Sequence, residues 1–567
     1  MTARHLPDEA SVVTREVAWR HATNPVLPAF HPDPSVCRVD HGSPGASDVW
    51  YYLISSTFEY LPGLPVHRSR DLVTWELVGH VVTDQLDYTR VHDSGGLYAP
   101  TIRHDGERFL VVCTHLGGPE GASGTFITTA TDAAGPWTPP VWWHGVQGVD
   151  PSLLLDDDGR IWAHGGRGAT PPQWEGHGEI WVRELDPATL ELTGPEHVIW
   201  SGAAVGATWP EGPHLYRRGR HVYLVAAEGG TGRHHAVVVA RAEQPTGPFT
   251  SAPDNPVLTH RHLGPEAAVV NVGHADLVQA SDGSWWALAL ASRLAGGIDL
   301  LGRETFLLPV TWRSGICAGD PGDDGDWPVL APGVGTLVPE PGGPDGVRAD
   351  RLGGGDGVGA GLGGLPERTW IGVRRLPSTI AETGGIGGIG GVGGVGGIGG
   401  AGEVALRAGA GLGDHLPAFI GQRLHVLEGS VTQGLGDAVE HLSGPAEGGI
   451  AEVGLALRQS TPQWLTVGVR SADGGTEVVV TRSVDGTVEV AAAIAAPAGL
   501  DRLRLTITGR VGLVEALTAD GAAHEVGRVD VGHLSTTHAG WFVGVVTGPY
   551  AVGDGVLSLP APEQVPA

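Results

Sequence analysis

The chain has 567 residues and a formal net charge of −28, and it contains no lysine, so arginine supplies all of its positively charged side chains apart from histidine. A strongly acidic chain repels nucleic acids and anionic membranes, and we therefore exclude both as expected partners. The length exceeds that of one ordinary hydrophobic core and predicts two domains.

Cysteine usage and the start of the chain indicate the compartment. Three cysteines, Cys37, Cys113 and Cys317, are too few for a disulfide framework and form no CxxC pair, which is typical of a reducing compartment. The first residues carry no apolar stretch typical of a signal peptide, and no apolar run is long enough to cross a bilayer. We expect a cytoplasmic protein, with a leader missing from the given chain as the alternative.

Five short motifs recur along the first half of the chain at nearly even spacing. They read HPDPSV (31–36), YAPTI (98–102), VDPSL (149–153), WPEGPHL (209–215) and GHADL (273–277). With anchors at Asp33, Ala99, Asp150, Glu211 and His274, the steps are 66, 51, 61 and 63 residues. Three anchors are carboxylates, so the repeat predicts one site built from several equivalent units.

Each anchor is followed by a turn signal and then by an aromatic or β-branched run, such as 49–54 or 109–112. Short runs joined by Asp-Gly or similar pairs predict β-hairpins. Four-stranded units repeated at this length are typical of a β-propeller, whose first strands line the central channel. We therefore expect an N-terminal tail over 1–21 and a five-bladed propeller over 22–330. A single β-sandwich is the main rival, but it predicts no repeat of long period.

The second half of the chain indicates another all-β domain. A Gly/Pro-rich connecting segment is expected over 331–365, and alternating runs over 366–567 predict a C-terminal β-sandwich. Within the sandwich, 384–402 reads GGIGGIGGVGGVGGIGGAG. The absence of proline argues against a collagen helix, and we expect a flexible surface loop, with a self-associating Gly/Ile tract as the alternative.

Asp33, Asp150 and Glu211 form the candidate catalytic set. Hydrolysis of a glycosidic bond needs a carboxylic acid to protonate the leaving oxygen and a carboxylate to activate water or attack the sugar. A third charge can keep the pKa of the acid high through like-charge repulsion. A carboxylate beside Pro or Gly is more often a turn residue, but three at equivalent repeat positions favour a shared site.

Longer segments resemble glycoside hydrolase family 43, most closely its two-domain β-xylosidase and α-L-arabinofuranosidase type. The segments that carry the resemblance are 24–36, 56–72, 93–100, 211–216, 227–231 and 301–305. The resemblance is strong over about 24–310 and weaker beyond. It implies an inverting hydrolase in which Asp33 is the general base, Asp150 orients the acid and tunes its pKa, and Glu211 is the general acid.

The resemblance also assigns substrate-binding residues. Arg303 matches an arginine beneath the sugar, with a surface salt bridge as the alternative. His274 matches an axial histidine that supports the acid network, a water or a metal ion, with a core histidine as the alternative. Phe58 and Tyr98 match subsite positions, although relatives often carry Trp in place of Tyr98. The loop over 540–545 resembles a family loop that reaches from the sandwich to the active site. By that match, Phe542 would close the pocket.

Some positions depart from the family pattern or match it weakly. His31 stands where Asn is commoner, Pro210 precedes the acid, and the 384–402 insertion has no recognised counterpart. Trp209 is a weaker candidate for the pocket wall, and we expect it to have a packing role. The departures remove no catalytic group, but they leave the exact substrate preference open.

The implied activity is exo-cleavage of β-1,4-xylo-oligosaccharides at the non-reducing end, with release of xylose and also of arabinose from α-L-arabinofuranosides. Alternatives are a pure α-L-arabinofuranosidase and a non-catalytic carbohydrate-binding propeller; a retaining fructosidase is disfavoured because no Asn-Asp-Pro-Asn-Gly start is present. We expect a small oligosaccharide as the substrate, no required cofactor and no assigned metal ligands. A divalent ion such as calcium on the propeller axis or in the sandwich, and a homo-oligomer, both stay open.

Overall fold

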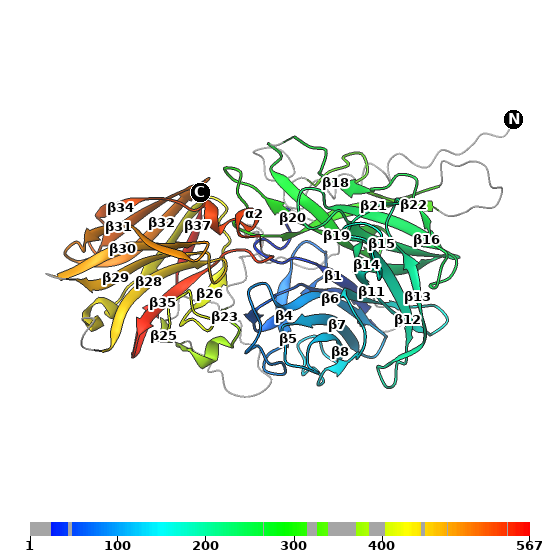
Figure 1. Cartoon of the computed structure of the whole chain (residues 1–567), viewed down its shortest axis with the longest axis horizontal. Helices are drawn as coiled ribbons and strands as arrows, with labels where there is room; N and C mark the ends of the chain where they lie inside the picture. The colour runs from blue at the N-terminus through cyan, green and yellow to red at the C-terminus, as the bar shows by residue number, and fades with distance from the viewer. Residues whose placement is uncertain are drawn as a thin grey trace.

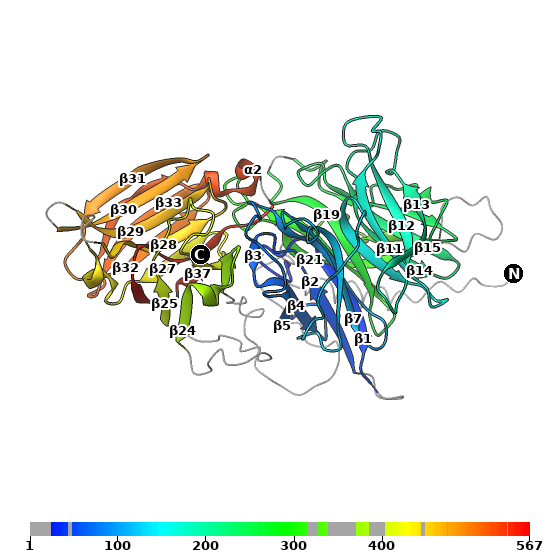
Figure 2. The same cartoon turned by 60° about the horizontal axis from the view of Figure 1, so that its bottom comes forward.

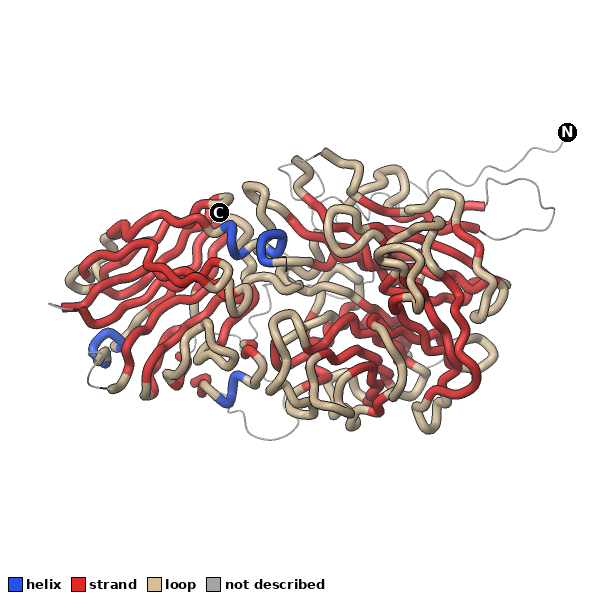
Figure 3. The backbone as a smooth tube through the Cα atoms, in the orientation of Figure 1, coloured by secondary structure: helices blue, strands red, loops and turns tan. Residues whose placement is uncertain are grey.

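The computed structural model describes residues 24–42, 48–264, 266–314, 326–337, 370–384, 403–443, 448–472, 475–540 and 542–567. Within them the chain forms two β-rich lobes that lie side by side (Figure 1) and contain very little helix (Figure 3). The expected N-terminal tail, Cys317, most of the connecting segment and the Gly-rich insertion after Gly384 lie outside the described residues.

The N-terminal lobe contains five antiparallel sheets that follow one another in chain order. Blade 1 comprises β1 (Ser35–Asp40), β2 (Val49–Ile54), β4 (Gly63–Ser69) and β5 (Glu76–Val82). Blade 2 comprises β6 (Gly96–His104), β7 (Phe109–Leu116), β8 (Gly124–Ala130) and β9 (Val141–Trp142). Blade 3 comprises β10 (Val149–Leu155), β11 (Ile161–Gly168), β12 (Gly178–Leu185) and β13 (Leu192–Trp200).

Blade 4 comprises β14 (Glu211–Arg218), β15 (His221–Glu228), β16 (Ala236–Ala242), β17 (Thr250–Ser251) and β18 (Leu258–Thr259), the last of which pairs with β16. Blade 5 comprises β19 (Val269–Gln279), β20 (Trp285–Arg293), β21 (Glu304–Ser314) and β22 (Asp326–Leu330). The predicted five-bladed propeller is confirmed, because each repeat of the sequence folds into one sheet.

The segment before β1 joins the first blade to the last. Leu27 forms an isolated bridge with Thr305 of β21. The side chain of Asn24 donates to the carbonyl of Leu307 at 2.8 Å and accepts from its N–H at 2.9 Å. The ring of blades is therefore closed by backbone pairing, with segments about 280 residues apart side by side.

The C-terminal lobe is a β-sandwich, as predicted (Figure 2). Its eight-stranded sheet runs in the order β3 (Tyr60–Leu61), β23 (Ile371–Val373), β26 (Ile420–Arg423), β35 (Val546–Gly553), β28 (Ile450–Arg458), β29 (Trp464–Ala472), β30 (Gly475–Val484) and β31 (Thr487–Ala495). A five-stranded sheet contains β34 (Ala523–Asp530), β33 (Val511–Thr518), β32 (Leu500–Thr508), β27 (Gly429–Gly434) and β37 (Glu563–Pro566). The two sheets bury alternate apolar residues against each other, such as Leu465 and Val467 of β29 and Leu503 and Leu505 of β32.

Smaller elements complete the sandwich. A three-stranded sheet contains β24 (Ala381–Gly384), β25 (Glu403–Arg407) and β36 (Val556–Pro560). The helical turns are η1 (Pro377–Thr379), η2 (Ala438–His441), η3 (Gly532–Leu534) and α2 (Thr536–Ala539). In the part of the chain that the structure describes, no helix has both the length and the apolar character needed to cross a membrane.

The two lobes share a strand and a tight loop contact. β3 belongs to the propeller segment in sequence, yet Tyr60 and Leu61 pair with Val373 and Gly372 of β23, so the propeller extends the edge of the sandwich sheet. On the other side, the N–H of Val545 donates to the carbonyl of Leu300 at 2.9 Å. These contacts hold the sandwich against the propeller loop that precedes β21.

Candidate active site

Each blade has a residue with a left-handed backbone within its inner strand or, in blade 1, just before that strand. The φ angles are 55° at Asp33, 34° at Ala99, 56° at Asp150, 56° at Gly212 and 40° at His274. In blade 4 the equivalent residue is therefore Gly212 and not Glu211, and the steps become 66, 51, 62 and 62 residues. The expectation of three carboxylates at equivalent positions was wrong in this respect: Glu211 precedes its blade's equivalent position by one residue.

A ring of buried polar residues lies two positions after these five. Its members are Ser35, Thr101, Ser152, His214 and Asp276. Arg103 of β6 reaches this ring and contacts inner strands of the other four blades, through Ser35, Leu153, His214 and Asp276. Its guanidinium therefore links the blades at the propeller axis, next to the candidate site. The sequence analysis did not predict this role.

Asp33 is surrounded by groups that complement a carboxylate. Arg303 donates through Nη1 to Oδ1 at 3.1 Å, and Ser56 donates through Oγ to Oδ2 at 2.6 Å. The Oγ of Ser56 also accepts the N–H of Ala99 at 2.7 Å, which ties blade 1 to blade 2 at this point. Because Arg303 is buried against Asp33, the alternative reading of Arg303 as a surface salt bridge was wrong.

Asp150 and Glu211 lie on neighbouring blades, and their carboxyl groups interact electrostatically. The N–H of Gly212 donates to Oδ2 of Asp150 at 2.9 Å, which brings the Asp150 carboxylate beside the backbone of Glu211. Burial and then the charge of Asp150 raise the pKa of Glu211 to about 8. Burial also raises the pKa of Asp150, and His274 and the Gly212 N–H act against that rise by favouring its anion. The Glu211 side chain keeps 25% of its surface accessible and can meet a substrate.

Glycine at position 212 is required by the neighbouring His274 and by its own backbone conformation. A Cβ at this position would lie 2.9 Å from Nδ1 of His274, and the backbone φ is in the left-handed region. Because Gly212 has no side chain, the imidazole of His274 can pack directly on its backbone, next to Glu211. Its Nδ1 lies 3.8 Å from Oδ1 of Asp33, so His274 adjoins both the Asp33 and the Glu211 sides of the site.

His235 is a further site residue that the sequence reasoning missed. Its Nε2 lies 4.0 Å from Oε1 of Glu211, and its Nδ1 is paired at 3.1 Å with the carbonyl of Asn271. Burial lowers the pKa of His235 to about 3, so the ring is neutral and adds no positive charge beside the acid. No motif in the sequence points to it, because it belongs to the loop before β16 and reaches Glu211 only through the folding of blade 4.

Three aromatic rings form one wall beside Arg303. Phe58 and Phe542 stack with ring centres 5.7 Å apart, and Tyr98 meets Phe58 edge-on at 5.0 Å. The guanidinium of Arg303 lies 5.3 Å from the centre of the Phe542 ring. The structure thus brings together all of the residues assigned to the sugar pocket, including Phe542 from the sandwich.

Trp209 is not packed into the core, contrary to expectation, and 49% of its surface is exposed. Its backbone is left-handed, with φ at 50°, and its N–H donates to the carbonyl of Gly176 at 2.7 Å. A Cβ on Gly176 would lie 2.9 Å from the indole, and one on Gly230 would lie 3.2 Å away. The indole therefore rests on two glycines and leaves the rest of its surface open, two residues from Glu211.

The axis does not fit the divalent ion that the sequence left open. Arg103 donates to both oxygens of Asp276, at 2.9 and 3.2 Å, and to Nδ1 of His214 at 3.2 Å. These are the groups that would otherwise ligate a cation there. Among the described residues, no group of three or more His, Cys, Asp or Glu side chains could hold a metal ion.

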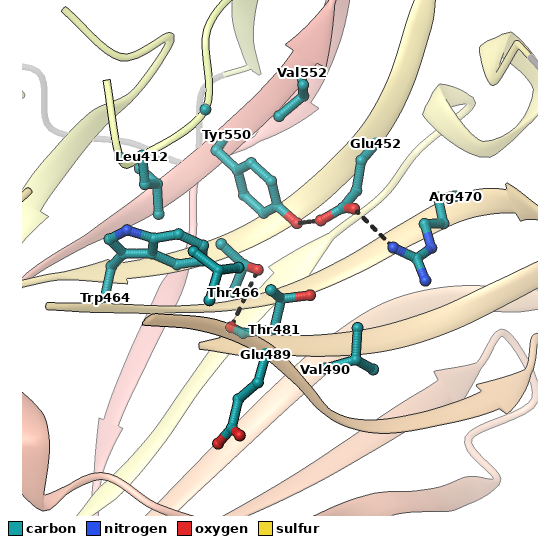
Figure 4. Close-up of a pocket in the computed structure, with 13 residues that line it drawn as sticks. Leu412, Glu452, Trp464, Thr466, Arg470, Thr481, Glu489, Val490, Tyr550 and Val552 are labelled. Carbon is teal, nitrogen blue, oxygen red and sulfur yellow. Dashed lines mark hydrogen bonds and ion pairs between the residues drawn. The ribbon is translucent and has the colours of Figure 1, made fainter. Parts of the chain in front are cut away.

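A separate hollow of about 330 Å³ lies on the outer face of the eight-stranded sheet (Figure 4). Its charged side chains are already paired with protein groups: the Tyr550 hydroxyl donates to Glu452, which lies 3.9 Å from Arg470, and Arg470 donates to Glu477 at 2.7 Å. None of the three candidate catalytic carboxylates lines this hollow. The candidate catalytic carboxylates therefore lie at the propeller site and not in this hollow.

Comparisons with known proteins match both lobes of the chain. Residues 22–317 match the model of Glycosyl hydrolases family 43, and 443–560 match that of the Beta xylosidase C-terminal Concanavalin A-like domain. A Xylosidase/arabinosidase of Butyrivibrio fibrisolvens is 41% identical over 56% of this chain and 58% of its own length. The Non-reducing end alpha-L-arabinofuranosidase BoGH43B of Bacteroides ovatus is 41% identical over 52% of this chain and 53% of its own length. The chain thus spans little more than half the length of these relatives.

Solved structures extend the likeness over both lobes. A xylan beta-1,4-xylosidase from Bacillus halodurans superposes with a TM-score of 0.77 at 26% identity, covering 96% of this chain and 99% of that one. The Bacteroides ovatus Xyloglucan PUL GH43B superposes with a TM-score of 0.75 at 28% identity over the same shares. With a family model matched over more than half of its 567 residues, the chain belongs to glycosyl hydrolases family 43.

Proposed function

We propose that this chain is an inverting exo-glycosidase that releases xylose from the non-reducing ends of β-1,4-xylo-oligosaccharides, and arabinose from α-L-arabinofuranosides. The observation that carries the proposal is the contrasting environment of two carboxyl groups in one site. Asp33 faces a guanidinium and a hydroxyl donor, whereas burial and the charge of Asp150 raise the pKa of Glu211. An inverting hydrolase needs this division into a base and an acid.

The proposed reaction uses the three carboxyl groups in distinct roles. Asp33 accepts a proton from the water whose oxygen forms the new bond to the anomeric carbon. Glu211 donates its proton to the glycosidic oxygen while the bond from that oxygen to the anomeric carbon breaks, so the leaving sugar departs as a neutral alcohol. Asp150 keeps the proton on Glu211 before reaction, because its own charge opposes ionisation of Glu211.

Substrate class is supported by the pocket wall and by the relatives. Tyr98 and Phe542 offer apolar contact to a sugar face, the buried Phe58 packs against both, and Arg303 adds hydrogen-bond donors beside them. Such a wall on one side of the site favours a single terminal sugar and exo action. The names of the relatives, xylosidase/arabinosidase and arabinofuranosidase, favour a pentose.

The stereochemistry of the first product tests the mechanism. Proton NMR of a freshly started digest of a β-xyloside should show α-xylose before mutarotation; first-formed β-xylose would rule out inversion. Glu211→Ala should lose about 10²–10⁴-fold in rate on xylobiose but much less on aryl xylosides with good leaving groups, which need little acid help. Equal losses on both substrates would remove Glu211 from the role of acid.

A pure α-L-arabinofuranosidase is the second candidate, favoured by 41% identity to a relative of that name. Rates on 4-nitrophenyl β-D-xyloside and 4-nitrophenyl α-L-arabinofuranoside, measured with one preparation, separate the two functions. Calorimetric binding of xylobiose without turnover would instead support a non-catalytic propeller. We also propose a cytoplasmic location on the basis of the low cysteine content, which cell fractionation tests.

A further inference from the structure

We propose that Asp93 is a positioning residue of the sugar pocket. Hydrogen bonds from the sandwich fix Asp93, and the adjoining Ser94 in turn positions Tyr98 and Phe542. The inference rests on the proposed function only for the identity of the sugar. Asp93 is proposed to contact neither the catalytic carboxylates nor the substrate. Its neighbour Ser94 contacts two residues of the aromatic wall.

The first step is the binding of the Asp93 carboxylate by the sandwich. Asp93 belongs to the propeller segment before β6, yet its carboxylate receives four hydrogen bonds from the sandwich. Arg374 and Arg458 donate to Oδ1 at 2.6 and 2.9 Å. Thr461 donates its hydroxyl to Oδ1 at 2.9 Å and its N–H to Oδ2 at 3.1 Å. Only 12% of the Asp93 side chain is accessible.

The second step leads from Asp93 to the pocket. Ser94 is buried with a left-handed backbone, φ at 52°, and each of its polar groups is engaged. Its Oγ accepts the N–H of Phe542 at 3.0 Å, and its carbonyl accepts the hydroxyl of Tyr98. Its N–H donates to Oε2 of Glu59 at 3.0 Å. One residue therefore sets the position of two of the three wall aromatics.

The third step is charge. Burial opposes ionisation of Asp93, but the charges of Arg458 and Arg374 outweigh it and lower the pKa of Asp93. Arg458 also lies 3.7 Å from Oε1 of Glu59, but burial raises the pKa of Glu59 to about 7, so Asp93 is the main negative charge beside the two buried guanidiniums. Removing the Asp93 charge leaves a net positive cluster at the contact between the lobes, which is costly for buried groups.

Asparagine is the sharpest substitution, because it keeps the shape of Asp93 and changes only charge and acceptor capacity. If the amide nitrogen replaces Oδ2, it faces the N–H of Thr461 and two donors oppose each other. If it replaces Oδ1, three donors lose their acceptor. Neither orientation of Asp93→Asn reproduces the native contacts, so Ser94 is expected to shift along with the wall.

The test measures sugar binding and catalysis in the full chain. Isothermal calorimetry gives the Kd of D-xylose, and steady-state kinetics on 4-nitrophenyl β-D-xyloside gives KM and kcat. For Asp93→Asn we expect Kd and KM to rise about 10-fold and kcat to change less than about 3-fold, because the wall is displaced while the carboxylates keep their contacts. Glu515→Gln is the matched control, since it disrupts a sandwich ion pair, with Arg504 at 2.8 Å and 16% of the Glu515 side chain accessible, away from the pocket.

A double-mutant cycle with Phe542→Ala separates positioning from general destabilisation. If Asp93 acts through the wall, Asp93→Asn should have a smaller effect on Kd in the Phe542→Ala background, because Tyr98 is then the one ring left for Ser94 to position. An undiminished effect in that background, or a Kd and KM equal to those of the wild type, would overturn the proposal. Ser94→Ala removes the acceptor of the Phe542 N–H without touching the ion pairs; it should raise Kd severalfold even if Asp93→Asn fails to fold, and an unchanged Kd would also overturn the proposal.

Failure of the proposed function has a different signature. A wild-type protein that binds xylose but cleaves neither the xyloside nor the arabinofuranoside would refute the activity, while the ratio of Kd values would still decide the role of Asp93. A wild-type protein that neither binds nor cleaves would overturn both.

Discussion

Replacing Arg103 with leucine should destabilise the propeller by about 3–5 kcal/mol, the usual cost of stranding a buried charge. Asp276 is fully buried, and Arg103 donates to both of its oxygens, at 2.9 and 3.2 Å. Without the guanidinium, Asp276 keeps three neutral donors: the Ser35 hydroxyl, the Val36 N–H and the Tyr216 hydroxyl. They hydrogen-bond the carboxylate but supply no opposite charge.

The destabilisation should depend on pH in a defined direction. In the wild type, burial opposes ionisation of Asp276, but Arg103 outweighs it and lowers the pKa of Asp276. This contribution to stability is complete above the unfolded pKa of about 3.9 and is lost as the pH falls through the folded value. In Arg103→Leu the remaining burial should raise the pKa of Asp276, so a penalty builds as the pH rises through that value. The gap between the two proteins therefore widens from pH 4 to pH 7.

Scanning calorimetry at pH 4 and pH 7 measures the effect. At about 2 °C per kcal/mol for a domain of this size, Tm should fall by about 6–10 °C at pH 7. Arg313→Leu is the control, because the Arg313–Asp254 pair is half exposed at 51% and 54% and should cost less than about 1 kcal/mol. Adding Asp276→Asn to Arg103→Leu should recover part of the loss. A loss no larger than that of the control, or equal at both pH values, would refute the reasoning.

Three further outcomes are expected. The kcat/KM of the wild type should stay high up to about pH 8 and fall above it, as Glu211 loses its proton; a basic limb near pH 5 would contradict the assigned acid. Trp209→Ala should raise KM about 5-fold for xylobiose and leave it unchanged for methyl β-xyloside, because its exposed indole can stack on the leaving sugar; equal effects on both substrates would argue against that role. Dialysis against EDTA should change neither rate nor Tm, since Arg103 takes up the axial carboxylate of Asp276; activity lost and then restored by calcium would refute this.

Local signals in the sequence were sufficient for the propeller. Turn pairs such as Asp158-Gly159 and Asp282-Gly283 separate the first two strands of their blades, and hairpins are specified by residues close in sequence. The long-period repeat then predicted the number of blades. For the sandwich, alternation in β28 and β29 predicted the fold class, because one face of each strand is buried.

The candidate site was predictable where it follows motifs and family resemblance. The structure pairs Arg303 with Asp33, brings Asp150 to the N–H of Gly212, and stacks Phe542 on Phe58 although alignment near Phe542 is loose. The repeat alone misplaced Glu211 by one residue, because spacing cannot reveal which residue of a short motif takes the left-handed backbone. That choice is made by neighbours such as His274, which packs where a Cβ on Gly212 would lie.

The all-β class, the order of the two domains and the carboxylates available for chemistry could all be predicted from the sequence, because strands, turns and motifs are encoded over short distances. The contacts that join these parts became visible in the folded chain. Arg103 binds Asp276 across 173 residues, His235 comes to lie beside Glu211, and Asp93 meets Arg458 across 365 residues. These contacts arise when the ring of blades closes and the sandwich docks on it, and no periodicity of the chain encodes which side chains then meet.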